Sequence, residues 1–319
     1  MSDLYPEIEP YDCVYLQVSP LHQLYVEQVG NPQGIPILFL HGGPGGRSWP
    51  WDRRLFDPQK FRIILYHQRG CGWSKPAGCL AQNTTADLIQ DIETIRRHYG
   101  IARWHLFGGS WGATLALLYA QQYPRYVQSL TLRGAFLCRP EDIAWLYQPG
   151  GASDIHPQFW QPYCEHIPTD ERTDFVSAYY QRLCVSDNPE VQRAAALQWA
   201  DWEFKLSHLI PKESDHAALL EPQELLNLAR LETHYFVHHG FLDHKTAILN
   251  PKKIREIEFL PITLIHGRYD SICRLSGAFE LHQKLKKSTL HVVEGAGHAD
   301  DEPGILAQLL TTLNALSEN

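Results

Sequence analysis

Ser110 stands in the stretch Gly108-Gly109-Ser110-Trp111-Gly112, which fits the pattern G-x-S-x-G. This pattern is typical of a nucleophile elbow, a strand-to-helix turn that presents a serine hydroxyl for attack. Such a tight turn accepts only small flanking residues, as Gly108 and Gly112 are. The alternative is a glycine-rich turn without chemistry, because so short a pattern also arises by chance. A serine nucleophile therefore needs support from elsewhere in the chain.

A serine hydroxyl attacks well only when a base takes its proton, and the base needs a partner that fixes its tautomer. In strand-turn-helix proteins of this kind the partners follow the serine in the order acid, then histidine, each after a later strand. Asp270 follows the apolar segment "ITLIHGRY", and His298 in "GAGHAD" follows "LHVVE". This order predicts a catalytic triad of Ser110, Asp270 and His298.

A tetrahedral oxyanion needs two N–H donors, one from the residue after the nucleophile and one from a loop after the third strand. The residue after the nucleophile is Trp111, and the loop reads "HGGPGG" from His41 onward. Gly43 is the predicted second donor, with Gly42 as the alternative. A phosphate-binding loop is excluded because the spacing G-x-x-x-x-G-K-[ST] is not met.

The composition indicates an ordinary globular protein, with 44% hydrophobic and 20% charged residues among 319. A formal net charge of −8 argues against a nucleic acid or an anionic membrane as the main partner. The acidic start "MSDLYPEIEP" has no basic and apolar signal pattern, and no apolar run approaches the roughly 20 residues of a membrane span. The seven cysteines are odd in number and scattered without C-x-x-C, which favours a reduced, cytoplasmic compartment.

Strand-like and helix-like segments alternate through the first part of the chain. Apolar runs bounded by turn residues predict strands at 13–18, 23–29, 35–40, 61–66, 103–109 and 127–134. Helices are expected within 84–100, capped by Thr85 and ended by Gly100, and from about Trp111 to Pro124. The first two strands form a hairpin around Ser19 and Pro20. The rest predicts a parallel sheet with helices on both faces.

The alternation stops near Phe136 and returns at "LPITLIHGRYD", "STLHVVEGAGH" and a closing amphipathic helix, "PGILAQLLTTLNAL". The segment between is helical in pattern and rich in tryptophan, histidine, proline and glutamine. We expect an α/β fold, a mostly parallel sheet with helices on both faces, interrupted by a helical cap. The predicted core is 1–136 and 255–319, and the predicted cap is 137–254.

Several motifs together resemble the proline iminopeptidases, or prolyl aminopeptidases, of the α/β-hydrolase fold. The shared motifs are "HGGPGG", "QRGCGWS", "GGSWGATLALLYAQQYP", "LRGAF", "WADWE", "LETHYF", "HGRYD" and "GAGH". They run from about Gly30 to the last helix, cap included. The resemblance implies a serine exopeptidase that removes N-terminal proline from short peptides through an acyl-enzyme, without metal or cofactor.

The resemblance also implies roles for cap residues. Glu203 and Glu232 fall on acids that bind the free α-amino group of the substrate. Charge-assisted hydrogen bonds from carboxylates inside a dry cap could hold an ammonium group at a fixed distance from Ser110. Arg133 is expected to pair with one of these acids or to brace the site.

A proline ring needs flat apolar walls. Phe136, Tyr147 and Phe236 are candidates for them, although each could equally be ordinary cap packing. Cys273, three residues after the acid, either lines the site or is a bystander.

Four positions depart from the family pattern. His67 stands where the family usually has Asp, Trp73 where it has Arg, Thr233 where it has Asn and Arg274 where it has Pro. None touches the predicted triad, but the bracing of the loop around Arg69 is put in question.

Other functions stay open at this point. His234 and His238 have the i, i+4 spacing of a helical metal pair, but the glutamate of H-E-x-x-H is missing, so no metal site is predicted. The rival enzymatic hypothesis is a broader aminopeptidase or amidase, or a carboxylesterase, which would not need Glu203 and Glu232. A non-catalytic ligand-binding protein of the same fold is the hypothesis from another class.

Overall fold

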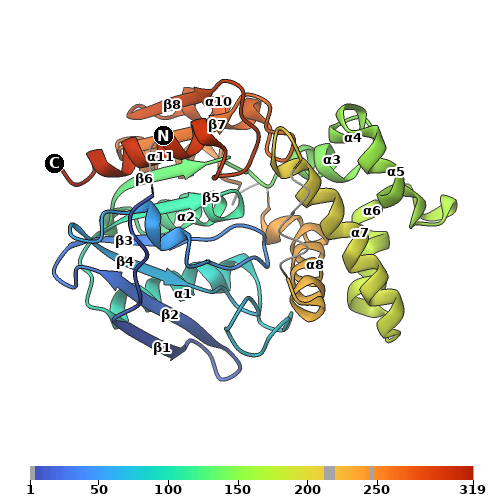
Figure 1. The fold of residues 1–319 in the computed structure, drawn as a ribbon, viewed down its shortest axis with the longest axis horizontal. Helices are drawn as coiled ribbons and strands as arrows, with labels where there is room; N and C mark the ends of the chain where they lie inside the picture. Colours follow the sequence, from blue (N-terminus) through green and yellow to red (C-terminus); the bar gives the residue numbers. More distant parts are fainter. Residues whose placement is uncertain (1–3, 212–219, 244–246, 319) are drawn as a thin grey trace.

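The computed structural model describes residues 4–211, 220–243 and 247–318. Its described residues form one eight-stranded sheet in the order β1-β2-β4-β3-β5-β6-β7-β8 (Figure 1). The strands are β1 (Asp12–Gln17), β2 (Gln23–Gly30), β3 (Ile35–Leu40), β4 (Phe61–Tyr66), β5 (Trp104–Gly109), β6 (Val127–Arg133), β7 (Ile262–Gly267) and β8 (Ser288–Val293). Each predicted strand is present to within a few residues.

The sheet is antiparallel at one edge and parallel elsewhere. β1 pairs antiparallel with β2, and β2 with β4, whereas the pairs from β4 through β3, β5, β6 and β7 to β8 are parallel. The predicted hairpin and the predicted mostly parallel sheet are therefore confirmed. Parallel pairing brings the ends of β3, β5 and β7 to one edge of the sheet.

Helices cover both faces of the sheet because alternate strand residues point to opposite sides. In β3, Leu38 and Leu40 belong to a buried cluster that also includes residues of helices α1 (Thr85–His98), α2 (Trp111–Gln122) and α10 (Leu275–Lys284). Their neighbours Ile37 and Phe39 pack on the other face with α11 (Pro303–Ala315) and the 3-10 turn η1 (Asp52–Leu55). A second 3-10 turn, η2 (Pro124–Tyr126), joins α2 to β6.

The N-terminus of α1 corrects one prediction. Thr84, not Thr85, is the N-cap residue, and its side chain accepts from the N–H of Asp87. The hydroxyl of Thr85 donates instead to the carbonyl of Gly240, far along the chain. Asp87 lies three residues after Thr84 and completes a capping box with it, a local signal that Thr85 lacks because Leu88 follows it at that spacing. Gly100 follows the helix end with φ of +63°, as predicted for a terminating glycine.

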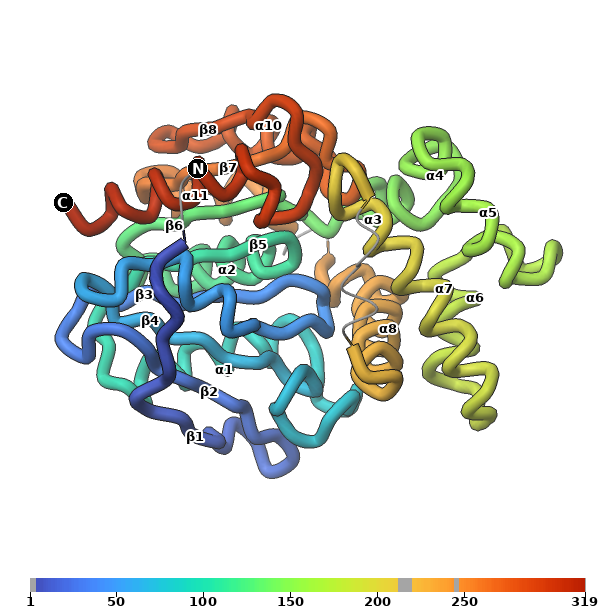
Figure 2. Tube along the Cα trace, viewed as in Figure 1, coloured from blue at the N-terminus to red at the C-terminus, as the bar shows by residue number. Residues whose placement is uncertain are grey.

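Helices without strands follow β6 in the described part of the chain up to β7. They are α3 (Pro140–Tyr147), α4 (Ala152–Ile155), α5 (Pro157–Glu165), α6 (Phe175–Tyr180), α7 (Pro189–Ser207), α8 (Pro222–Val237) and α9 (Pro251–Ile257). Short helical turns, η3 (Thr169–Glu171), η4 (Gln181–Val185) and η6 (His239–Phe241), connect some of them. We call α3–α8 the cap helices; Figure 2 traces them as a group beside the sheet.

Helix α9 packs on α2 of the sheet layer rather than on the cap helices. Two of its residues, Ile254 and Ile257, are buried in the cluster that covers the sheet. The division of the chain into a core and a 137–254 cap stays a prediction.

A buried ion pair braces the loop after β4. Arg69 donates from Nε and Nη2 to the two carboxylate oxygens of Asp91 on α1, both at 2.7 Å. We expect Asp91→Asn to lower the free energy of unfolding by about 3 kcal/mol, because it leaves a buried guanidinium without its full charge partner. Urea unfolding measures this, with Arg268→Ala in an exposed pair with Glu294 as the control that should change little. An equal effect of both changes would contradict the assigned role.

Candidate active site

Ser110 occupies a strained turn between β5 and α2. Its φ of 56° and ψ of −120° lie outside the ordinary regions for a non-glycine residue. A Cβ on Gly108 would lie 2.4 Å from the Gly112 carbonyl oxygen, and one on Gly112 would lie 2.0 Å from that of Leu40. The glycines are therefore required by backbone contacts on both sides of the turn. Strain of this kind is typical of functional sites.

Gly112 yields a test of the turn. We expect Gly112→Ala to lower the free energy of unfolding by about 3 kcal/mol, since the added methyl group meets rigid backbone. Gly277→Ala on α10 is the matched control, because its Cβ meets only side chains at 3.4 Å or more. Thermal or urea unfolding of both variants gives the comparison. Equal stability of the two would refute the steric argument.

Asp270 and His298 form a hydrogen-bonded pair at the ends of β7 and β8. His298 Nδ1 donates to Asp270 Oδ2 at 2.7 Å. The other carboxylate oxygen accepts from the N–H groups of Ile272 at 3.0 Å and Cys273 at 2.8 Å. Burial opposes ionisation of Asp270, but His298 and these donors outweigh it and lower the pKa of the carboxyl below its ordinary value. The carboxylate can thus hold the imidazole in one tautomer.

Arg133 lies on the other ring nitrogen of His298. Its Nη1 donates to His298 Nε2 at 2.9 Å and to the carbonyl oxygen of the same residue at 3.2 Å. No hydrogen bond joins Ser110 to His298 among the described residues, and Ser110 Oγ instead contacts Cys273 Sγ at 3.9 Å. The Arg133 guanidinium thus donates to His298 Nε2, the atom that accepts the Ser110 proton in the predicted triad. Catalytic hydrogen bonds often form fully only when substrate is bound.

The glycine loop after β3 lies beside the nucleophile. A Cβ on Gly42 would come within 3.4 Å of Ser110 Cβ, and both Gly42 and Gly43 line the cavity above Ser110. Gln68 holds this loop by donating from Nε2 to the His41 carbonyl at 2.9 Å. Its Oε1 accepts from the indole N–H of Trp111 at 3.1 Å. The loop and the start of α2 are thereby tied together, as an oxyanion site would need.

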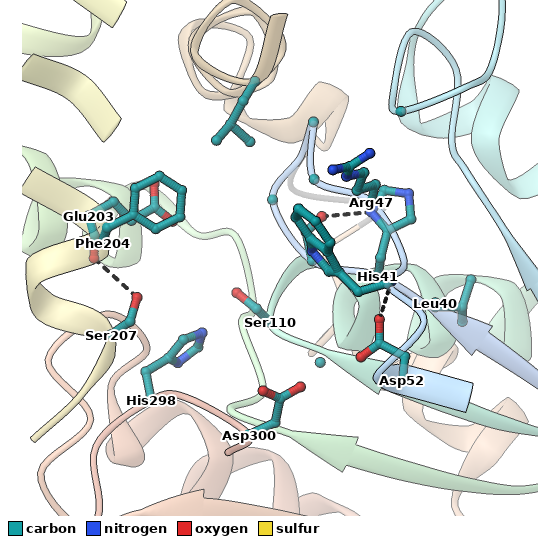
Figure 3. A pocket seen from close by; sticks show the side chains of 18 of the residues that line it. Leu40, His41, Arg47, Asp52, Ser110, Glu203, Phe204, Ser207, His298 and Asp300 are labelled. Carbon is teal, nitrogen blue, oxygen red and sulfur yellow. Dashed lines mark hydrogen bonds between the residues drawn. The ribbon is translucent and has the colours of Figure 1, made fainter. Parts of the chain in front are cut away.

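A cavity of about 520 Å³ opens above Ser110 (Figure 3). Its walls come from the loop after β3, from α7 and α8 of the cap helices, and from the loop after β8. Residues with polar or charged side chains in these walls are His41, Arg47, Asp52, Ser110, Arg133, Glu203, Ser207, Glu224, Asn227, Glu232, His298, Asp300 and Asp301. The cavity is large enough for a short peptide end.

Glu203 of α7, which is half-buried, and Glu232 of α8, which is buried, line this cavity as a pair of carboxyls. Glu203 Oε2 accepts from the hydroxyl of Tyr147 at 3.1 Å, and Glu232 Oε2 from the indole N–H of Trp199 at 2.7 Å. Burial raises the pKa of Glu232 well above its ordinary value, and the neighbouring Glu203 raises it further. Burial also raises the pKa of Glu203. Such a pair favours a bound cation, which would replace its shared proton.

The three predicted wall aromatics pack on one another. The rings of Tyr147 and Phe236 lie 5.3 Å apart, and those of Phe136 and Phe236 6.0 Å apart. None of the three is among the residues that line the cavity, so in this structure they form the layer behind its walls. Arg133 contacts neither Glu203 nor Glu232 and lies on His298, which fits the bracing alternative of its prediction.

The departures from the family pattern are accommodated by packing. The rings of His67, Tyr25 and Trp73 contact one another, with centroids 4.8 to 5.3 Å apart, so an aromatic cluster stands where the family has Asp and Arg. Burial lowers the pKa of His67 to about 3, which keeps it neutral. The hydroxyl of Thr233 donates within α8, and Arg274 pairs with Asp142 at 2.6 Å. The last two replacements thus lie outside the cavity.

His234 of α8 and His238, the residue at its C-cap, each place a ring nitrogen within hydrogen-bond distance of a backbone carbonyl oxygen. His234 Nε2 lies 3.1 Å from the Asn83 oxygen, and His238 Nδ1 lies 2.7 Å from the His234 oxygen. Their ring centroids are 5.1 Å apart. Within the described ranges, no group of three or more His, Cys, Asp or Glu side chains is arranged to hold a metal ion.

Asp52 and Asp300 belong to the cavity although the sequence analysis did not identify them. Asp52 begins η1 after the glycine loop, and Asp300 lies two residues beyond His298. The only sequence signal for them is that Asp52 shortly follows the "HGGPGG" loop and Asp300 shortly follows "GAGH". They line the same cavity because two loops that are far apart in the chain come together there.

Comparison with known proteins agrees with this geometry. Residues 35–300 match the family described as alpha/beta hydrolase fold. The chain belongs to this fold family and, within it, to the proline iminopeptidase family. It is 46% identical to a probable proline iminopeptidase of Leptolyngbya boryana, covering 97% of this chain and 95% of that protein. It is also 46% identical to the proline iminopeptidase of Arabidopsis thaliana (96% and 80% covered) and 44% identical to that of Neisseria gonorrhoeae (96% of each).

Solved structures share the fold at low sequence identity. A haloalkane dehalogenase variant from Bradyrhizobium elkanii superposes with a TM-score of 0.65 at 16% identity, covering 98% of this chain and 97% of that one. An esterase from Rhodococcus gives a TM-score of 0.57 at 16% identity, with 98% and 99% covered. These likenesses support the α/β-hydrolase fold. Among the described helices, none combines the length and apolarity that a membrane crossing requires.

Proposed function

We propose that the protein is a serine exopeptidase that releases N-terminal proline from short peptides. The observation that carries this proposal is the acid pair, half-buried Glu203 and buried Glu232, in the same cavity as Ser110. A carboxyl pair in that position suits a substrate with a free ammonium group. The likeness to proline iminopeptidases over nearly the whole chain supports the same activity.

In the proposed reaction, Ser110 Oγ attacks the carbonyl carbon of the N-terminal proline. Its proton passes to His298 Nε2, while Asp270 keeps the imidazole oriented through Nδ1. The N–H groups of Trp111 and Gly43, or Gly42, stabilise the oxyanion. The carbon–nitrogen bond then breaks, and the leaving amine takes the proton from His298.

A prolyl ester of Ser110 remains after this step, and water hydrolyses it. His298 takes a proton from the water, the ester bond breaks, and the proton returns to Ser110 as free proline leaves. For either step to begin, Arg133 has to release His298 Nε2, which it holds in the free protein. We infer that a bound substrate brings about this release.

The acid pair supports cleavage of the first peptide bond alone. An ammonium group held between Glu203 and Glu232 sets the distance from the amino terminus to Ser110. A blocked amino terminus removes the charge and adds atoms that the closed end of the site has to accommodate. The proposal therefore requires a free amine.

The experiment that tests the function is a panel of fluorogenic N-terminal aminoacyl amides, with N-acetyl-proline amide as the control. We expect the prolyl amide to be hydrolysed fastest and the blocked compound not at all. Hydrolysis of the blocked compound would refute an amine-anchored exopeptidase. Equal turnover of many aminoacyl amides would favour the broader aminopeptidase.

We also infer that the protein works in a reducing compartment, the cytoplasm. All seven cysteines are free thiols, and three of them, Cys71, Cys138 and Cys273, are buried. Burial raises the pKa of each of these thiols, which keeps them protonated and unreactive. To test the thiol state, protein purified without reductant is run on a non-reducing gel to detect disulfides. Its free thiols are compared with those labelled in the lysate.

A further inference from the structure

A second pair of carboxyl groups lines the cavity near Ser110. Asp52 is only 5% exposed, and its Oδ2 accepts from the N–H of Trp49 at 2.6 Å. Its Oδ1 has no hydrogen-bond partner among the described residues. Burial and the nearby Asp300 carboxylate raise the pKa of Asp52 well above its ordinary value. A carboxylate oxygen held in a cavity without a partner is suited to a cationic ligand.

Asp300 adds the second charge. No hydrogen bond or ion pair occupies its side chain among the described residues, whereas the adjacent Asp301 accepts from His208 at 2.6 Å. No lysine or arginine nitrogen of the described residues lies within 4 Å of either Asp52 or Asp300. Arg133 acts on Asp52 only at longer range, because its guanidinium lies on His298. The two carboxyls are thus a charge pair without a protein cation.

The position of this pair relative to Ser110 indicates what it would meet. Figure 3 shows Ser110 between Glu203 on one side and Asp52 and Asp300 on the other. If the amino terminus lies at Glu203, the first residue spans the distance to Ser110. The residue after the cleaved bond then extends toward Asp52 and Asp300.

We propose that Asp52 and Asp300 form an anionic subsite for the side chain of the second substrate residue, and that this subsite selects peptides with lysine or arginine after the proline. The inference rests on the proposed exopeptidase function and adds a preference to it. The ammonium or guanidinium group would donate to Asp52 Oδ1 and to Asp300. Its positive charge would favour the ionised form of Asp52, whose pKa burial otherwise raises.

The test compares prolyl-lysine amide with prolyl-norleucine amide, which has a side chain of the same length without the charge. For the unchanged protein we expect kcat/KM to favour the lysine peptide by about tenfold or more, as is typical for charge-assisted hydrogen bonds in a partly dry site. The rate of proline release from each of the two substrates is measured by mass spectrometry. Added salt should reduce the preference.

Substitutions test whether Asp52 and Asp300 cause the preference for lysine over norleucine. Asp300→Asn and Asp52→Asn should each lower the lysine-to-norleucine ratio several-fold, and Asp300→Lys should bring it below one and favour prolyl-glutamate amide. Glu171→Gln removes one charge from an ion pair with Arg182, outside the cavity walls, and should leave the ratio as it was. Because each ratio is taken within one variant, a loss of folded protein lowers both rates and leaves the ratio intact.

Two failures are distinguishable. If the unchanged protein cleaves neither prolyl peptide, the proposed function is wrong. If it cleaves both at equal rates, or if Asp300→Lys keeps the preference for lysine, the function stands and the anionic subsite is refuted.

Discussion

Replacing Ser110 by alanine is expected to lower hydrolysis of a prolyl amide by about 10⁴- to 10⁶-fold. The reason is that the covalent route disappears, while the acid pair and the cavity still bind the substrate. The measurement is kcat on a fluorogenic prolyl amide, together with labelling by a fluorophosphonate. The variant should lose both turnover and label.

The matched control for this variant is Ser129→Ala. Ser129 lies on β6, is buried, and has its hydroxyl 2.7 Å from His105 Nδ1, away from the cavity walls. Ser129→Ala removes the same hydroxyl oxygen from a buried site. The variant should therefore keep its turnover and its labelling by the fluorophosphonate. Turnover by Ser110→Ala within a few-fold of the unchanged protein would overturn the nucleophile assignment.

Charge-neutralising changes at the acid pair are expected to have the second-largest effect. Glu203→Gln and Glu232→Gln should each lower kcat/KM for a prolyl amide by about 10- to 100-fold, because each removes a charge-assisted hydrogen bond to the ammonium group. Hydrolysis of a simple acyl ester, which has no amine, should change much less. Steady-state rates on both substrates decide the matter. An equal loss on both would favour the carboxylesterase or broad amidase.

The same pair predicts a direction for the pH dependence. Burial and Glu203 raise the pKa of Glu232, so the pair retains a proton at a pH where an exposed glutamate is ionised. Binding of the ammonium group expels that proton. KM for the prolyl amide should therefore fall as pH rises through the pKa of the pair, while KM for the ester stays level. In Glu232→Gln the slope for the amide should disappear.

Much of the fold was predictable because its signals are local. Short apolar runs such as 35–40 and 61–66, bounded by turn residues, are expected for buried strands, and Gly108 and Gly112 flank a serine where a strand meets a helix. The order of Ser110, Asp270 and His298 then followed from strand ends alone. Their precise roles remain proposals, and so does the boundary of the cap.

Other features were beyond local patterns. The hydrogen bond from the Thr85 hydroxyl to the Gly240 carbonyl joins residues 155 positions apart. His67 and Trp73 pack with Tyr25 of β2, a ring cluster that joins distant parts of the chain. Side chains with similar neighbours in the sequence take different roles because their partners come from distant segments of the chain.

The sequence by itself determined the sheet, the serine turn and the chain order of the catalytic candidates, since backbone sterics and apolar spacing act over a few residues. Only the tertiary structure decided that Arg133 lies on His298 Nε2 and that Asp52 and Asp300 line the same cavity as Glu203. These contacts join loops from separate strands, and their energies depend on burial and on charges that come together only when the sheet and the cap helices have packed.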